Sequence, residues 1–361
     1  MATVNFRAQL DSPKIFDPQS LQTGIASHFS EATAKPIPGN DIIPFLVPRV
    51  QRLLAKIPVE DMLEMEEIRM RQGRSLLLRI GTNEFGLTAE GKLTNQLEEG
   101  LVIKAEDLHR TLQIISQSSI YALEEELRSG FLTLPGGHRV GLVGQAVVEK
   151  TRIKTLKYIS GLNFRIGRQI LGAANKLIPY LLDRRHERIY HTLLVSAPQA
   201  GKTTLLRDII RQLSDGIPEL GFPGINVGLV DERSEIAGCY AGIPQKDIGM
   251  RTDVLDRCPK AEGMLMLLRS MSPRVVAADE IGRQEDADAI EDLLSAGVTV
   301  ISTVHGSSLA DLEQRPVLRN LMAEKIFERI VLLGRSRGVG TIEAVLNGRN
   351  SQILWGKIPG A

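Results

Sequence analysis

The chain has 361 residues, of which 43% are hydrophobic and 24% are charged, and its formal net charge is +1. This length predicts two or three domains, and the balanced charge gives no global argument for binding nucleic acid or an anionic membrane. No apolar stretch approaches the roughly 20 residues that a membrane-spanning helix needs, and the start of the chain lacks a secretory signal. We therefore expect a cytoplasmic protein that reaches the inner face of the cell membrane only through partners.

The chain contains two cysteines, Cys239 and Cys258, and neither belongs to a CxxC motif. So few cysteines do not imply a disulfide framework, which favours a reducing compartment. We interpret both side chains as structural or incidental thiols.

Residues 1–40 are mixed in composition and rich in turn formers, and they end in the linker-like sequence "AKPIPGN". We expect them to form a flexible N-terminal arm. Residues 41–185 follow as a predicted α+β domain. Its expected helices lie within 43–57, after the prolines of that segment, and at 104–117 and 121–130. Its expected strands are a pair within 66–80, a hairpin within 131–150 and a strand within 154–169.

Residues 186–361 alternate apolar strands with helical patterns, which is typical of an α/β domain with a parallel sheet wrapped by helices. The predicted strands are 192–196, 226–230, 274–279, 298–302 and 329–333, with a last β-like stretch at 340–346. The carboxyl ends of such strands meet at one edge of the sheet, where α/β proteins bind their ligands.

The first of these strands runs into the sequence "SAPQAGKTT" and then a helical pattern. Such a loop directs backbone N–H groups and the positive end of a helix at one point, which suits a nucleotide phosphate. Gly201 allows close backbone approach, Lys202 can reach the β- and γ-phosphates, and Thr203 can ligate Mg²⁺. Ser196 replaces the first glycine of the usual motif, and a chance match at a helix start is the alternative. The candidate nucleotide-binding residues are Ser196, Ala197, Pro198, Gln199, Ala200, Gly201, Lys202, Thr203 and Thr204.

Two acidic residues, Asp279 and Glu280, end the strand predicted at 274–279. In P-loop NTPases the first acid at this place holds the Mg²⁺ water shell, and the second polarises the attacking water. The next strand leads to Thr303 and His305, which we expect at the same sheet edge, beside the γ-phosphate. An ordinary strand end and a structural histidine are the alternatives.

A further acidic pair, Asp231 and Glu232, follows the strand predicted at 226–230 and should emerge at this edge too. One of the two is a candidate to orient water or the metal. The alternative is a solvated run of charges.

Several long motifs of the chain resemble the stage III sporulation protein AA family. The resemblance covers roughly residues 41–350 and is specific, because it includes the block "VDERSEIAG…PQ…RTDVLD…CPKAEGM" as well as "VVAADEIGRQEDADAIEDLLSAGVTVISTVHG". That family supplies the ATPase of a channel between mother cell and forespore in endospore-forming bacteria. It is similar to the traffic ATPases of type II and type IV secretion, which form hexameric rings with an N-terminal domain packed on a RecA-like domain.

The resemblance implies a P-loop ATPase that uses ATP and Mg²⁺, assembles as a homo-oligomer, and works with membrane-embedded channel components. Lys202 matches the phosphate-loop lysine, and Asp279 and Thr203 remain the metal ligands expected from the motif. Glu280 matches the proposed catalytic base. Asp231 and Glu232 match an acidic box, and His305 matches a histidine box. In such rings an arginine from the N-terminal domain or a neighbouring subunit reaches the nucleotide. Candidates are Arg128, Arg139, Arg165 and Arg168, with Arg251 and Arg283 in the ATPase domain, although each is also explained as a solvated or structural arginine.

Two other functions share part of this signature. A nucleic-acid motor of the RecA or helicase type would need a basic groove bearing aromatic residues, whereas aromatic residues make up only 4% of this chain. A non-enzymatic, nucleotide-gated scaffold would bind ATP without needing a catalytic base, and Glu280 argues against it. We therefore expect an ATP-hydrolysing motor and no nucleic-acid partner.

Overall fold

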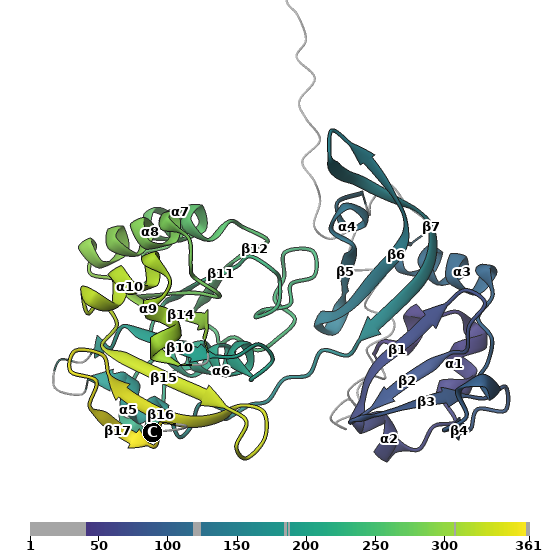
Figure 1. The fold of residues 1–361 in the computed structure, drawn as a ribbon, viewed down its shortest axis with the longest axis horizontal. Helices are drawn as coiled ribbons and strands as arrows, with labels where there is room; N and C mark the ends of the chain where they lie inside the picture. The colour runs from purple at the N-terminus through teal and green to yellow at the C-terminus, as the bar shows by residue number, and fades with distance from the viewer. Residues whose placement is uncertain (1–40, 118–123, 184–185, 187, 307, 359–361) are drawn as a thin grey trace, which may run out of the picture. The chain divides into compact units, whose positions relative to one another are not determined.

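The computed structural model describes residues 41–117, 124–183, 186, 188–306 and 308–358. The arm expected at residues 1–40 lies outside the described residues. Most strands belong to two sheets, one of seven strands and one of eight (Figure 1). Among the helices of the described residues, none combines the length and the apolar character needed to cross a bilayer.

The seven-stranded sheet is antiparallel throughout and has the order β4-β3-β2-β1-β7-β6-β5. The predicted strand pair within 66–80 and the predicted hairpin within 131–150 are both confirmed, whereas β3 and β4 were not predicted. The strands are β1 Met65–Arg71, β2 Leu77–Ile80, β3 Asn83–Leu87, β4 Leu93–Thr94, β5 Phe131–Leu134, β6 His138–Glu149 and β7 Arg152–Arg165.

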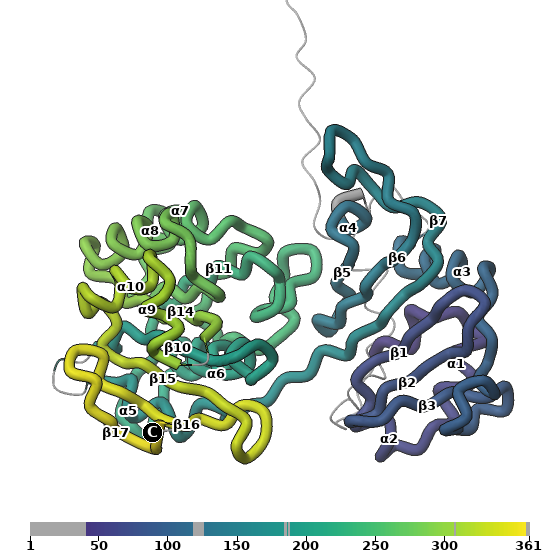
Figure 2. The backbone as a smooth tube through the Cα atoms, viewed as in Figure 1, coloured from purple at the N-terminus to yellow at the C-terminus, as the bar shows by residue number. Residues whose placement is uncertain are grey.

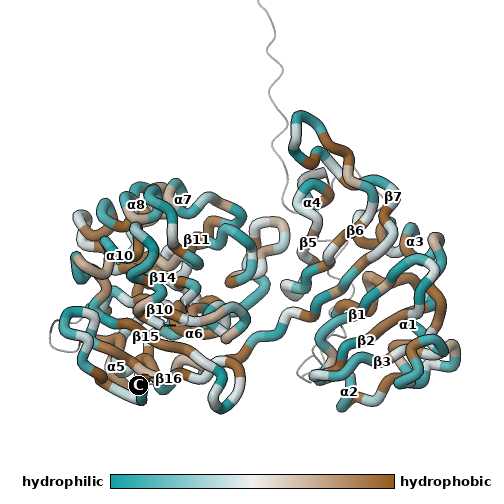
Figure 3. Tube along the Cα trace, viewed as in Figure 1, coloured by the Kyte–Doolittle hydropathy of each residue, from teal (hydrophilic) through white to brown (hydrophobic). Residues whose placement is uncertain are grey.

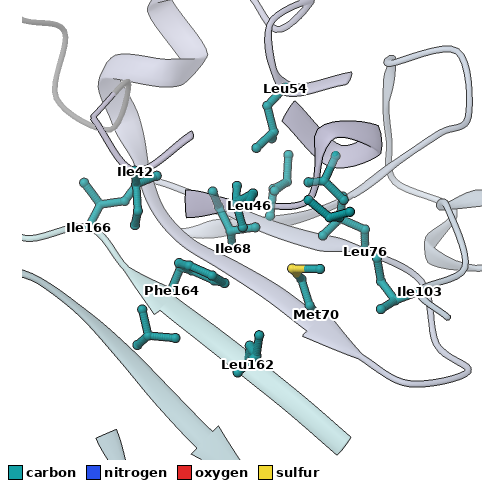
Figure 4. Packing of buried hydrophobic residues seen from close by; sticks show 14 of the residues in the cluster. Ile42, Leu46, Leu54, Ile68, Met70, Leu76, Ile103, Leu162, Phe164 and Ile166 are labelled. Carbon is teal, nitrogen blue, oxygen red and sulfur yellow. The ribbon is translucent and has the colours of Figure 1, made fainter. Parts of the chain in front are cut away.

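The helix expected after the prolines of residues 43–57 is confirmed. A 3-10 turn covers Ile43–Phe45, and α1 begins only at Pro48, because proline has no N–H to donate and is favoured in the first turn of a helix. Phe164 of β7, Ile68 of β1 and Leu54 of α1 belong to one hydrophobic core (Figure 4). The helices of this half are α1 Pro48–Leu54, α2 Val59–Glu64, α3 Ala105–Ile115 and α4 Glu124–Ser129, with 3-10 turns at Leu97–Glu99 and Pro135–Gly137.

The eight-stranded sheet has the order β12-β11-β13-β14-β10-β15-β16-β17. Its first six strands in this order are parallel, and β16 and β17 continue it antiparallel. All five strands predicted here, and the β-like stretch at 340–346, are confirmed, and β12 and β17 are additional. The strands are β10 Thr192–Ser196, β11 Val227–Asp231, β12 Thr252–Asp256, β13 Val275–Ala278, β14 Thr299–His305, β15 Arg329–Gly334, β16 Thr341–Asn347 and β17 Ile353–Gly356.

Helices cover both faces of this sheet, which is why β10, β11 and β13 are buried along their whole length and consist almost entirely of apolar residues. Leu205 and Ile209 of α6 pack on one face, and Met264 of α7 and Ile290 of α8 pack on the other. The helices are α5 Ile178–Leu181, α6 Lys202–Asp215, α7 Lys260–Ser270, α8 Gln284–Ser295, α9 Leu309–Glu313 and α10 Pro316–Ala323, with a 3-10 turn at Pro218–Leu220 and a short strand pair, β8 Leu182–Asp183 and β9 Arg188–Ile189.

The two sheets have separate hydrophobic cores. The core of the seven-stranded sheet extends along the chain to Ile166. Ala174, Leu177 and Leu181 already pack in the core of the eight-stranded sheet. We therefore propose a domain boundary between Ile166 and Ala174, earlier than the one expected at residue 185.

Candidate nucleotide-binding site

The candidate phosphate loop connects β10 to α6. β10 ends at Ser196, and α6 begins at Lys202. Gly201 has φ +91° and Gln199 has φ +58°, and these two positive values turn the chain from strand into helix within a few residues. The strand–loop–helix arrangement predicted from the sequence is therefore present. It provides the free N–H groups and the positive helix end that suit a phosphate group.

The loop between β15 and β16 packs against this turn. The backbone N–H of Gly340 donates a hydrogen bond of 3.0 Å to the carbonyl oxygen of Ala200. The Arg335 guanidinium donates one of 2.8 Å to the carbonyl oxygen of Gln199. A Cβ atom on Gly201 would lie only 2.9 Å from the Cα of Gly340, so glycine is required here for packing as well as for φ. These contacts hold the phosphate loop in shape from outside its own sequence.

The Lys202 side chain lies beneath the loop and is 5% exposed. Its Nζ donates to the carbonyl oxygen of Ser196 at 2.9 Å, to Ser196 Oγ at 3.1 Å and to Nδ1 of His305 at 2.9 Å. Burial lowers the pKa of Lys202, and the charges of two nearby carboxylates offset part of this effect. Because an ammonium group has no lone pair to offer, Nδ1 of His305 must be the acceptor. In a neutral His305 the proton is therefore on Nε2.

The Glu280 carboxylate has a partner at each oxygen. Oε1 lies 2.6 Å from Nε2 of His305, and Oε2 lies 2.9 Å from NH1 of Arg233. The residue has φ +52°, and its backbone N–H donates to Thr303 Oγ1 at 3.0 Å. Left-handed backbone is uncommon for glutamate, and such conformations persist where surrounding contacts hold them. Arg233, His305 and Lys202 thus form one continuous chain of polar contacts through Glu280.

Asp279 lies beside the start of α6. Its Oδ2 is 3.5 Å from Thr203 Oγ1, and its Oδ1 accepts a hydrogen bond from the Thr303 hydroxyl. Burial raises the pKa of Asp279, although the hydrogen bond from Thr303 opposes this effect. A hydroxyl and a carboxylate oxygen are hard donors, and Mg²⁺ is commonly held by one or two such ligands together with water and substrate phosphates. The donor set at Thr203 and Asp279 therefore fits Mg²⁺.

Comparison with known proteins decides the family. The family model described as "Sporulation stage III, protein AA" matches residues 39–353. The chain belongs to this family. It is 45% identical over 307 residues to stage III sporulation protein AA of Bacillus subtilis (strain 168), with 85% of this chain and 94% of that protein covered.

Solved structures that share the fold are P-loop ATPases. The Legionella pneumophila ATPase DotB has a TM-score of 0.52 and 16% sequence identity, with 83% of this chain and 78% of that chain covered. The pilus retraction motor PilT with bound ADP has a TM-score of 0.50 and 14% identity, with 82% and 80% covered. Membership of the sporulation protein AA family thus comes with a traffic-ATPase fold.

Three of the four candidate arginines of this family member lie near the phosphate loop. Arg139, Arg165 and Arg168 line a cavity of about 250 Å³ together with Thr203 and Thr204. Arg139 forms an ion pair with Glu235, and Arg168 donates a hydrogen bond to the carbonyl oxygen of Met65. The Arg165 side chain is 63% exposed, and its Nε lies 3.8 Å from Glu67 Oε1. The fourth candidate, Arg128, lines a different hollow.

Arg251 is placed away from the phosphate loop. Its guanidinium donates to the carbonyl oxygen of Ser214 at 2.8 Å, at the C-terminal end of α6. The helix has 14 residues, so this end is about 20 Å from the phosphate loop. Arg283 is the N-cap residue of α8, where its backbone N–H donates a hydrogen bond of 3.0 Å to Asp286 Oδ2. The Arg251 side chain is therefore bound at the end of α6 that is remote from the phosphate loop.

The acidic pair after β11 is divided between two roles. The Asp231 carboxylate accepts hydrogen bonds of 2.8–2.9 Å from the backbone N–H groups of Glu235, Ile236 and Ala237, so it orders the following loop. Burial raises the pKa of Asp231. Glu232 pairs with Lys260 of α7 rather than with Lys202. The sequence had placed both acids at the sheet edge, but it did not reveal these partners.

Sequence reasoning missed Arg233, Arg335 and Gly340. Arg233 directly follows the acidic pair in the sequence "DERSE". Its position as a cation between acidic residues was the only indication of a functional role. Arg335 and Gly340 belong to "GRSRGVGT", whose glycines indicated a turn without indicating what it would contact.

Proposed function

We propose that this protein is an ATP-hydrolysing motor of the secretion-ATPase type, which powers assembly of or transport through a channel between mother cell and forespore. The proposal rests on one observation. Lys202, Thr203, Asp279, Glu280 and His305 come from three separate stretches of sequence and meet at the carboxyl edge of the eight-stranded sheet. The family and the fold of the structural neighbours support the same activity.

The residues divide the work of phosphoryl transfer. The loop N–H groups and Lys202 bind the β- and γ-phosphates, for which Lys202 exchanges its hydrogen bonds to Ser196 and His305 for phosphate oxygens. Thr203 and Asp279 would hold Mg²⁺, and the ion would supply positive charge opposite the transferred group. Glu280 orients the attacking water and accepts its proton at a carboxylate oxygen, and His305 fixes the direction of that carboxylate.

A complete site is proposed to need a second subunit. Arg165 lines a cavity with Thr203 of the same chain, so it is the candidate to reach the nucleotide from the N-terminal domain of that subunit. A further arginine is proposed to come from the neighbouring subunit. Arginine across a subunit boundary stabilises charge in the transition state of many P-loop enzymes. We expect a homo-oligomer, in keeping with a hexameric ring, in which an isolated monomer hydrolyses ATP slowly. Membrane-embedded channel components are its proposed partners, and we propose no nucleic acid among them.

The test compares the wild type with Lys202→Ala and Glu280→Gln in assays of ATP hydrolysis, nucleotide binding and mass with and without ATP. Lys202→Ala should lose binding and hydrolysis. Glu280→Gln should bind ATP but hydrolyse it about 10²–10⁴-fold more slowly, the usual contribution of a general base. Lys176→Ala, which removes an exposed lysine elsewhere, is the control and should behave as the wild type.

Three results would redirect the proposal. No heat of ATP binding to the wild type would remove the motor function altogether. Hydrolysis that rises on adding DNA and falls steeply with salt would favour a nucleic-acid motor. A Glu280→Gln protein that keeps full cellular function without turnover would favour a nucleotide-gated scaffold.

A further inference from the structure

The strands β6 and β7 extend past their neighbours as a two-stranded arm (Figures 1 and 2). β5 pairs with β6 only as far as Gly141, and β1 pairs with β7 only from Gly161 onward. Between these points β6 and β7 pair with each other, out to Glu149 and Arg152. We define residues 143–158 as the β6–β7 arm.

The β6–β7 arm concentrates positive charge at its tip. It contains Lys150, Arg152, Lys154 and Lys157 against a single acid, Glu149, so its net charge is +3 in a chain whose total is +1. Glu149 pairs with Lys154 at 3.1 Å. Within the described part of the chain, the other three cations have no acidic side chain within 4 Å. Most of the arm's charge is therefore available to an anionic partner.

A hollow of about 1010 Å³ opens beside the tip of the arm. Among the described residues of its lining, cations outnumber acids. The lining residues are Arg128, Glu149, Lys150, Arg152, Ile153, Lys154 and Thr155. Anionic groups of small size can enter such a hollow and meet several cations together.

The arm also exposes apolar side chains. Val143, Val148, Ile153 and Tyr158 are 59%, 60%, 48% and 82% exposed. Val148 and Ile153 are directly paired across the two strands, next to the cationic tip. Figure 3 shows hydrophobic and hydrophilic residues close together along the arm. Folding leaves this apolar surface in water, so it contributes nothing to either core.

We propose that the β6–β7 arm docks on the surface of an anionic lipid bilayer. The cations would contact headgroup phosphates, and Val148, Ile153 and Tyr158 would enter the boundary between headgroups and acyl chains, where tyrosine is favoured. Nucleic-acid interfaces are more polar and more strongly charged than this arm. An acidic protein would complement the positive charge of the arm. It would not complement the exposed aliphatic pair at the end of this two-stranded arm. The proposal does not depend on ATP hydrolysis.

The test is sedimentation of the full-length protein with vesicles. Vesicles of equal parts phosphatidylcholine and phosphatidylglycerol should bind the wild type, and vesicles of phosphatidylcholine alone should bind it much more weakly. Each basic residue near an anionic surface contributes about fivefold to partitioning. Lys150→Glu combined with Arg152→Glu should therefore weaken binding about tenfold or more. Val148→Ser combined with Ile153→Ser should also weaken it, with charge unchanged.

A control variant tests whether an effect on vesicle binding comes from the arm or from the change in net charge. Arg269→Glu combined with Arg319→Glu changes the net charge equally, at two exposed positions outside the arm, and should bind as the wild type. Tyr158→Trp should give a blue-shifted emission with anionic vesicles, while circular dichroism verifies that each variant folds. Equal vesicle binding by the arm and control variants would overturn the proposal. So would capture of duplex DNA or an acidic protein by the arm without vesicle binding, or a change only in oligomeric state.

Discussion

Alanine at Gly201 is expected to destabilise the eight-stranded domain more than alanine at Gly340, although both glycines have positive φ. Left-handed backbone costs alanine about 1–2 kcal/mol at either position. A Cβ on Gly340 would meet no atom within 4 Å, so strain is the whole cost there. A Cβ on Gly201 would lie 2.9 Å from a backbone atom, which adds about 1–3 kcal/mol of overpacking. The total for Gly201→Ala is thus about 2–5 kcal/mol.

The assay is urea unfolding followed by the fluorescence of Trp355. This is the only tryptophan of the chain, and it lies on β17, so it reports on the relevant sheet. Both substitutions reduce the entropy of the unfolded chain equally, so this effect cancels in the comparison. Gly201→Ala should also weaken ATP binding, because the loop must shift. Equal stability of the two variants would refute the packing argument and leave backbone strain as the sole role of Gly201.

Three further predictions concern individual polar contacts. Arg233→Ala should slow ATP hydrolysis about two- to fivefold, the worth of an exposed ion pair, with unchanged ATP affinity in a fluorescent-nucleotide titration. Burial lowers the pKa of Lys246 from 10.5 to about 8, so the unfolded chain binds more protons between these values. The melting temperature of the wild type should therefore rise with pH above 8 relative to that of Lys246→Met, and parallel curves would contradict this linkage. Glu328→Gln should cost about 1–3 kcal/mol in chemical unfolding, because buried Glu328 accepts two hydrogen bonds from Arg188, and an unchanged stability would show that this pair contributes nothing.

Local patterns predicted much of the α/β half. β10, β11 and β13 are short apolar runs because both faces of these strands are buried, and such runs are visible in sequence. Prediction failed where burial was partial. β12 is half-buried along its length, and its sequence "TDVLD" resembles a loop as much as a strand. By contrast, the helix predicted after the prolines of residues 43–57 is confirmed, since Pro48 marks its start.

The candidate site also has parts that the sequence predicted and parts that it did not. The strand, the "SAPQAGKTT" turn and the helix are contiguous, so their order alone determined that Lys202 and Thr203 would lie at a helix N-terminus. The parallel alternation likewise determined that Asp279 and His305 would lie at the same sheet edge.

Only the tertiary structure decided which side chains meet at that edge. Arg233 reaches Glu280 from the loop after β11, and Arg335 reaches the phosphate loop from the loop after β15. Glu232, placed by sequence at the same edge, pairs with Lys260 instead. Strand order sets where a chain segment ends, whereas loop conformation and packing between distant segments set where its side chains point. The ends of the strands can be predicted from local hydrophobic periodicity. The directions of the side chains are determined only when the whole domain is folded.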